Sequence, residues 1–111
     1  MALPLTDVAQ LKDIVQSSPI TLVYFGAPDC AVCTVLKPKL FEMLAARFPQ
    51  VAGAEVDCAQ ARPLAAEYGV FAIPSVVAFI EGGESFRLAR AFGLAELAAQ
   101  LERPYTLLYG V

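Results

Sequence analysis

Cys30 and Cys33, within the stretch APDCAVC, are the residues of this chain best suited to chemistry. At the start of a helix, two intervening residues bring both sulfurs within disulfide range. Free backbone N–H groups and the positive end of the helix dipole stabilise a thiolate there. We therefore expect Cys30, the outer thiol, to attack a disulfide, and Cys33, deeper in the first turn, to close on the resulting mixed disulfide.

A zinc site is the alternative use of such a cysteine pair. Structural zinc takes about four ligands, usually Cys or His, but beyond the pair the chain supplies only Cys58, and it has no histidine. The residue count therefore favours redox chemistry without a metal or another cofactor. Cys58 is either a third redox thiol or a small hydrophobic residue, and we favour the second interpretation because nothing polar nearby would activate it.

Length and composition restrict the class of protein. The 111 residues correspond to one domain, residues 1–111. The net charge is −3 with scattered charges, without the basic stripe of a nucleic-acid surface. No segment reaches the roughly 18 uninterrupted apolar residues of a membrane helix, and the first residues do not resemble a secretory signal. Together with three cysteines, too few and odd for a disulfide scaffold, this predicts a protein of the reducing cytoplasm. We also expect a monomer.

The elements that must position the cysteines follow from apolar periodicity and breaker residues. Thr6 is the expected N-cap of the first helix, Pro38 the expected kink in the second, and Gly69 the expected C-cap of the third. The predicted helices cover residues 6–19, 31–48, 59–69 and 94–102, and the predicted strands cover residues 20–25, 51–57, 74–80 and 84–92. A C-terminal tail, residues 103–111, remains.

This order of elements predicts an α/β fold. The first two strands are joined through a long helix, which fits a right-handed parallel crossover, and the last two form an antiparallel hairpin. We expect a central mixed sheet of four to five strands flanked by about four helices. The cysteine pair then lies at the carboxyl end of the first predicted strand, where open α/β sheets place their chemistry.

Three segments together resemble the thioredoxin family. YFGAPDCAVC keeps the pattern F-x-A-P-x-C-x-x-C of the family's active-site strand and loop. Pro38 follows Cys33 by five residues, where the family kinks its long helix, and EYGVFAIPS is similar to its cis-proline loop. Gly93 before the last helix also matches. The resemblance covers roughly residues 5–102 and is specific as a set, whereas C-x-x-C alone is not.

The resemblance implies a thioredoxin-like fold and reversible dithiol–disulfide exchange with protein disulfide substrates. It also implies an electron donor of the thioredoxin-reductase type. The Ile73–Pro74 bond is expected to be cis, with Pro74 facing the cysteines as part of the catalytic site. Because proline has no N–H group, it leaves the backbone of its neighbour free to pair with a substrate strand. Ile73 and Gly93 are expected to contact substrate. A proline that merely begins an edge strand is the alternative for Pro74.

The loop around the cysteines departs from the family in three residues that would meet substrate. Asp29 replaces the usual aromatic residue before the first cysteine, and its carboxylate opposes thiolate formation by like-charge repulsion. The alternative is a solvated carboxylate whose charge is largely screened. Ala31 and Val32 replace the usual Gly-Pro between the cysteines. Val32 is expected to add an apolar contact to the substrate face.

A second departure concerns the acid that the family buries behind the resolving thiol. Tyr24 stands at that position here, and Glu55 aligns with the family's partner lysine. One hypothesis places Glu55 beneath Cys33, bonded to the Tyr24 hydroxyl, as a general base in catalysis. In the alternative, Glu55 points to solvent and Tyr24 simply fills space.

Three functional classes remain open at this point. The first is a general thiol–disulfide oxidoreductase acting on proteins. The second is a redox partner dedicated to one pathway, with little general reductase activity. The third is a chaperone or interaction module without catalysis, against which the intact Cys30, Cys33 and Pro74 argue.

Overall fold

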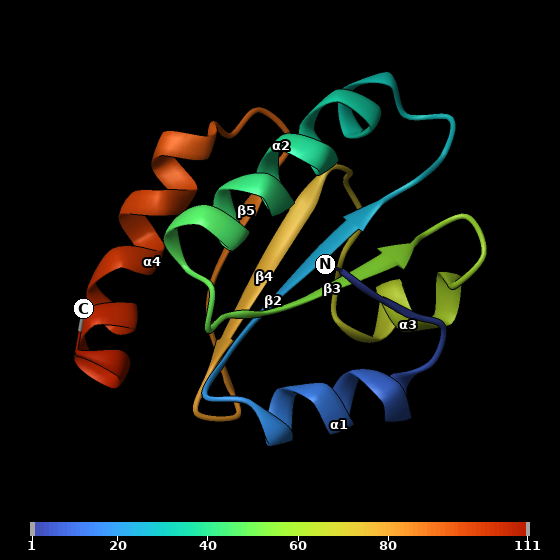
Figure 1. Ribbon diagram of the computed structural model, residues 1–111. Coiled ribbons are helices and arrows are strands. Elements are labelled where there is room, and N and C mark those ends of the chain that lie inside the picture. Colours follow the sequence, from blue (N-terminus) through green and yellow to red (C-terminus); the bar gives the residue numbers. More distant parts are fainter. Residues whose placement is uncertain (1, 111) are drawn as a thin grey trace.

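A five-stranded mixed sheet forms the centre of the computed structural model, which describes residues 2–110 (Figure 1). The strands are β1 (Leu3–Leu5), β2 (Ile20–Gly26), β3 (Ala52–Asp57), β4 (Ser75–Ile80) and β5 (Gly83–Ala89). The helices are α1 (Val8–Ser17), α2 (Ala31–Arg47), α3 (Arg62–Glu67) and α4 (Leu94–Tyr109). No helix in this described part of the chain has the length and apolar character needed to cross a membrane.

The strand order is β1-β3-β2-β4-β5. β3 runs parallel to both β1 and β2, whereas β4 runs antiparallel to β2 and to β5. The long helix α2 connects the parallel neighbours β2 and β3, as expected of a crossover. The α/β fold with a mixed sheet and four helices is therefore confirmed.

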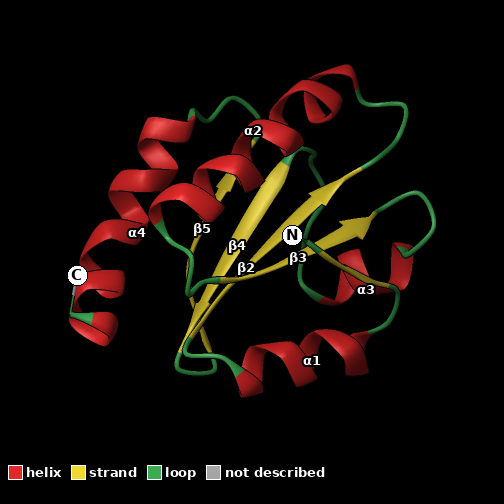
Figure 2. Ribbon diagram, viewed as in Figure 1, coloured by secondary structure: helices red, strands yellow, loops and turns green. Residues whose placement is uncertain are grey.

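β2 lies in the middle of the sheet, and all seven of its residues are buried. Its side chains alternate between two hydrophobic clusters, as the pleat of a strand requires. Tyr24 belongs to the cluster under α2 and α4, whereas Phe25 belongs to the cluster under α1 and α3. Figure 2 shows these two pairs of helices covering the sheet. Burial on both faces explains why the segment ITLVYFG is apolar throughout.

The N-cap of the first helix lies one residue later than predicted. Asp7, not Thr6, is the N-cap: its carboxylate accepts a hydrogen bond from the Gln10 backbone N–H at 2.9 Å. The Gln10 side chain in turn accepts from the Asp7 backbone N–H at 3.3 Å, which completes a capping box. The prediction missed this reciprocal pair because it considered only the first hydroxyl in the segment.

β1 and α3 also differ from the sequence prediction. β1 was not predicted, since a three-residue strand carries too little periodicity; it is held by pairing with β3 and by burial of Leu5. α3 has only six residues and ends in Tyr68 as its C-cap, so the prediction of Gly69 as C-cap was wrong by one residue. Gly69 follows the cap with a φ of +66°, a backbone conformation that glycine adopts without steric cost.

Residues 103–109 are not a tail but the second half of α4. Pro104 lies inside this helix and cannot donate a backbone hydrogen bond. The next residue, Tyr105, is 4% exposed and packs edge-on against Phe48 with ring centroids 5.2 Å apart. Its hydroxyl accepts a hydrogen bond from the backbone N–H of Gln50. These tertiary contacts offset the helix-breaking effect of the proline.

Candidate functional site

One edge of the sheet gathers the loops that carry the predicted site residues. The carboxyl ends of β2 and β5 both lie beside the first residue of β4, because Ser75 pairs with Phe25 on one side and Ala89 on the other. The Arg90 backbone N–H donates to the Pro74 carbonyl at 2.8 Å, which ties the loop before β4 to the end of β5. The start of α2, the loop before β4 and the start of α4 therefore share this edge (Figure 1).

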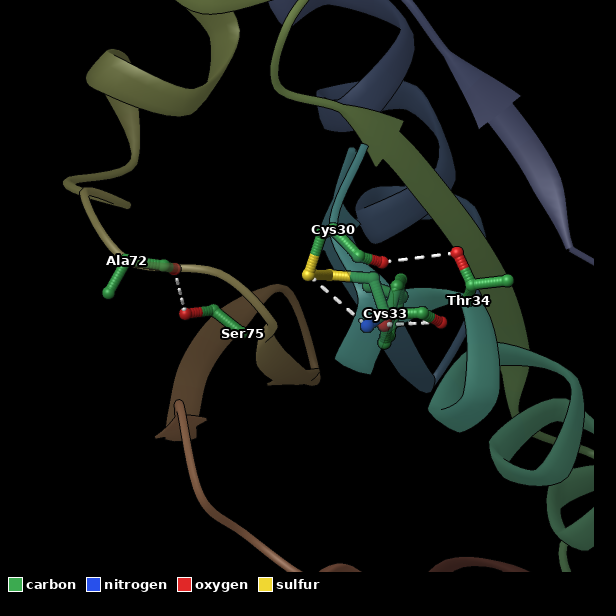
Figure 3. The surroundings of a disulfide bond; sticks show 6 residues. Cys30, Cys33, Thr34, Ala72 and Ser75 are labelled. Atoms are coloured by element: carbon green, nitrogen blue, oxygen red, sulfur yellow. Dashed lines mark hydrogen bonds between the residues drawn. A yellow bond between two sulfur atoms is a disulfide. The ribbon is translucent and has the colours of Figure 1, made fainter. Parts of the chain in front are cut away.

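The two predicted cysteines meet at the start of α2. Cys30 and Cys33 form a disulfide, with their Cα atoms 5.2 Å apart. Cys30 is the N-cap, and its Sγ accepts a hydrogen bond from the backbone N–H of Cys33 at 3.2 Å. The hydroxyl of Thr34 donates to the Cys30 carbonyl (Figure 3). A thiolate at Cys30 would keep this backbone donor and the positive end of the helix dipole.

The two sulfurs differ in their access to solvent. Cys30 is half-buried, whereas Cys33 is 4% exposed and belongs to the hydrophobic cluster under α2 and α4. The sulfur nearer to solvent is therefore that of Cys30, and the Cys33 sulfur is the more enclosed of the two.

The segment between α3 and β4 passes opposite the disulfide, as Figure 3 shows for the stretch from Ala72 to Ser75. The Ile73–Pro74 peptide bond is cis. The Ser75 hydroxyl donates to the Ala72 carbonyl at 2.6 Å and closes the turn. Pro74 is buried and Ile73 half-buried. Gly93, the N-cap of α4, follows β5 at the same edge and is exposed.

Three exposed residues flank the disulfide in the sequence, and a fourth lies in the loop before β4. Asp29, Ala31 and Val32 are all exposed, and Val32 leaves 60% of its surface accessible. Phe71, two residues before Ile73, is 86% exposed. We did not predict a role for Phe71, because a phenylalanine between two apolar residues gives no sign that it faces solvent.

A cavity of about 300 Å³ lies behind Cys33, between α2 and the ends of β2 and β3. Its walls are mostly apolar, and its polar side chains come from α2, β2 and β3. The lining residues are Tyr24, Gly26, Ala27, Pro28, Cys33, Thr34, Lys37, Pro38, Glu55, Val56 and Asp57. The cavity therefore brings both Glu55 and Tyr24 to the resolving cysteine.

The expected bond between Glu55 and Tyr24 is wrong. The Tyr24 hydroxyl instead donates to the backbone carbonyl of Cys33 at 3.3 Å. Glu55 pairs with Lys37 of α2, with Nζ and Oε1 2.7 Å apart, and its side chain is 30% exposed. Lys37 was not predicted, since it lies 18 residues from Glu55 and meets it only once α2 crosses the sheet.

Tyr24 is uncharged at physiological pH. Burial, with a smaller effect from the nearby Glu55 carboxylate, raises the pKa of its hydroxyl to about 12. The position where the resemblance implies an ionisable acid thus holds a neutral hydrogen-bond donor here.

Cys58 lies at the end of β3 and is half-buried. Burial raises the pKa of its thiol, and the neighbouring Asp57 carboxylate raises it further. A raised pKa lowers the thiolate fraction and hence the reactivity, which agrees with the interpretation of Cys58 as a small hydrophobic residue. Among residues 2–110, no group of three or more His, Cys, Asp or Glu side chains is arranged to hold a metal.

Comparison with known proteins gives one consistent result. A family model described as Thioredoxin matches residues 3–103. The thioredoxin-like protein YdfQ of Bacillus subtilis is 26% identical, over 96% of this chain and 94% of that protein. A thioredoxin of Mycolicibacterium smegmatis is 33% identical, over 86% of this chain and 88% of that protein. The crystal structure of Fasciola hepatica thioredoxin superposes with a TM-score of 0.82 at 31% identity, over 91% of this chain and 97% of that one.

Proposed function

Because the chain belongs to the thioredoxin family, we propose that it reduces disulfides of other proteins through Cys30 and Cys33 and is recharged by a thioredoxin-reductase-type donor. Its class as a disulfide oxidoreductase follows from the family and from the C-x-x-C disulfide. The proposal is supported above all by one observation: the Cys30 sulfur caps α2 and accepts the Cys33 N–H. A cytoplasmic location and a monomeric state belong to the same proposal, since a reducing compartment keeps the pair as a dithiol.

The reaction proceeds in two exchanges. The Cys30 thiolate attacks one sulfur of a substrate disulfide, forms a mixed disulfide, and releases the other substrate sulfur as a thiolate. Cys33 then loses its proton and attacks the Cys30 sulfur, which reforms the intramolecular disulfide and releases the second substrate thiolate. Two electrons pass from the dithiol to the substrate, and the two released thiolates take up protons from water.

Substrate chains are proposed to lie between the start of α2 and the loop before β4. Ile73 and Pro74 would form one wall and Ala31 and Val32 the other, with Gly93 at the end of the same edge. Support comes from the position of the stretch from Ala72 to Ser75 opposite the disulfide. Asp29 is exposed beside the cysteines, so its carboxylate would disfavour acidic substrate surfaces.

Glu55 is proposed to accept the proton that Cys33 loses, through water in the cavity that both residues line. Replacing Glu55 with glutamine keeps the shape of the side chain and removes the base. Disulfide reduction should slow by about a hundredfold near neutral pH, the lower end of the range for a general base. The measurement is the pH–rate profile of insulin reduction driven by dithiothreitol. Glu42→Gln, on the exposed surface of α2, is the matched control and should leave the profile unchanged. An unaltered profile in Glu55→Gln would remove Glu55 from the mechanism.

A redox partner dedicated to one pathway is the second candidate, favoured by the 86% exposure of Phe71 beside the proposed substrate groove. Phe71→Ala should raise the KM for a protein disulfide about threefold to tenfold, as expected from partial burial of an aromatic ring on binding. The rate with a small disulfide, which cannot reach Phe71, should not change. If the wild type and Phe71→Ala have the same KM for the protein disulfide and the same rate with the small disulfide, Phe71 contacts no substrate.

A further inference from the structure

Tyr24 is held directly beneath the resolving cysteine. Its side chain is 1% exposed and lies in the same hydrophobic cluster as Cys33. The ring meets Phe41 of α2 edge-on, with centroids 6.2 Å apart. The hydroxyl reaches the Cys33 carbonyl in the first turn of α2. The ring is thus fixed between the centre of the sheet and the start of the active-site helix.

Gly26 leaves the space that this arrangement needs. A Cβ atom at position 26 would lie 2.9 Å from Cε2 of Tyr24 and 3.3 Å from Sγ of Cys33. The ring edge and the sulfur therefore border the same small volume. A contact of 2.9 Å would force the buried ring to move, so any larger residue at position 26 would disturb the tyrosine under Cys33.

The acceptor of the Tyr24 hydrogen bond is a backbone oxygen, which the redox chemistry of the cysteines does not alter chemically. While the disulfide is closed, the covalent bond itself fixes Cys33 next to Cys30. In the mixed disulfide with substrate, that bond is absent at the moment when Cys33 must attack. The Tyr24 hydroxyl donates to a backbone oxygen, which is present in every redox state, and a neutral phenol adds no charge that would oppose a thiolate. Holding reacting atoms in place raises the rate of such an intramolecular step.

We propose that Tyr24 is a positioning residue for Cys33, which keeps the resolving thiol within reach of Cys30 after the disulfide has opened. This inference rests on the proposed exchange function. It assigns Tyr24 to the second exchange only. The first exchange uses the Cys30 sulfur and its donor, the Cys33 backbone N–H, and the Tyr24 hydroxyl bonds to neither of them.

A two-phase reaction separates the two steps. The reduced protein, in a Cys58→Ser background, is mixed with an equimolar aromatic disulfide whose released thiolate absorbs visible light. Attack by Cys30 releases one thiolate and leaves a mixed disulfide. Attack by Cys33 on that mixed disulfide reforms the Cys30–Cys33 bond and releases the second thiolate.

Tyr24→Phe retains the ring and removes the hydroxyl. Tyr105→Phe is the matched control, because it removes a buried hydroxyl that also makes one hydrogen bond to the backbone, at the far end of α2.

Tyr24→Phe should slow the second phase about threefold to tenfold, as expected for one hydrogen bond, and leave the first phase unchanged. Gly26→Ala, which displaces the ring, should slow the same phase. Lys37, Glu55 and Asp57 line the same cavity. The factor by which Tyr24→Phe slows the second phase should still not vary between about pH 6 and about pH 9, because Tyr24 stays protonated there.

Two results would overturn the inference: a second phase in Tyr24→Phe as fast as in the wild type, or an equal slowing of both phases. Equal slowing of the second phase by Tyr105→Phe would do so as well, since it would reflect a general loss of stability. A wild-type protein that releases no second thiolate would contradict the proposed exchange function itself. A wild-type protein that shows both phases, with Tyr24→Phe showing the same two rates, would contradict only the role of Tyr24.

Discussion

Cys30→Ser is expected to reduce the rate of protein disulfide reduction by at least about 10³-fold, as typical for loss of a catalytic nucleophile. A serine hydroxyl is not ionised near neutral pH, so the donor that Cys33 offers to the Cys30 sulfur would have no thiolate to stabilise. The precipitation of insulin after reduction with dithiothreitol measures this rate. The helix start would remain capped, because serine is a good N-cap residue. Loss of activity would therefore report chemistry, not unfolding.

Two companion variants sharpen this test. Cys33→Ser should still attack substrate but cannot release it, so a covalent complex through Cys30 should accumulate and be visible by mass spectrometry. Cys58→Ser should retain activity, because its thiol is half-buried with a raised pKa. Substantial reduction of insulin by Cys30→Ser would instead favour a binding module that acts without its thiols.

Phe25→Ala is expected to lower the free energy of unfolding by about 3–5 kcal/mol, the range for removing a buried aromatic side chain. Phe25 lies in the central strand β2 and has no exposed surface. It contributes to the cluster that joins the sheet to α1 and α3. A domain is stable by only about 5–15 kcal/mol in total, so this single change should remove a large share. Urea denaturation followed by circular dichroism gives the value.

Phe71→Ala provides the matched control for this stability measurement. The same side chain is deleted, but from a loop where it is 86% exposed, so the change should stay within about 0.5 kcal/mol. A loss below about 1 kcal/mol in Phe25→Ala would mean that the cluster under α1 and α3 collapses around the vacant volume and does not depend on this ring.

The sequence predicted those parts of the fold that depend on local pattern. The apolar run at β2 and the existence of the long helix α2 could be predicted from short windows of sequence, and their order implies the parallel crossover. The second half of α4 is different. TLLYG favours a strand by composition, and Pro104 argues against a helix. The decisive contacts of Tyr105 with Phe48 and Gln50 join residues far apart in the chain, so no local pattern could reveal them.

The same distinction applies to the candidate site. Spacing alone indicated Cys30 and Cys33, and the short Ile-Pro motif indicated Pro74. The ion pair of Glu55 with Lys37 could not be predicted, because it depends on how α2 crosses β3. The hydrogen bond from the Tyr24 hydroxyl to the Cys33 carbonyl could not be predicted either, because it depends on how closely α2 packs on the sheet. The exposure of Phe71 likewise follows from the path of its loop and not from its neighbours in the sequence.

The sheet separates the two hydrophobic clusters, and Cys33 belongs to only one of them. Heat tolerance and reduction potential are consequently open to independent adjustment. Tighter packing between the sheet and helices α1 and α3 would slow thermal inactivation and leave the reduction potential of the cysteine pair unchanged. Changes beneath α2 would shift both properties together. A library of variants restricted to the cluster under α1 and α3 could thus yield a heat-resistant catalyst with unaltered redox behaviour.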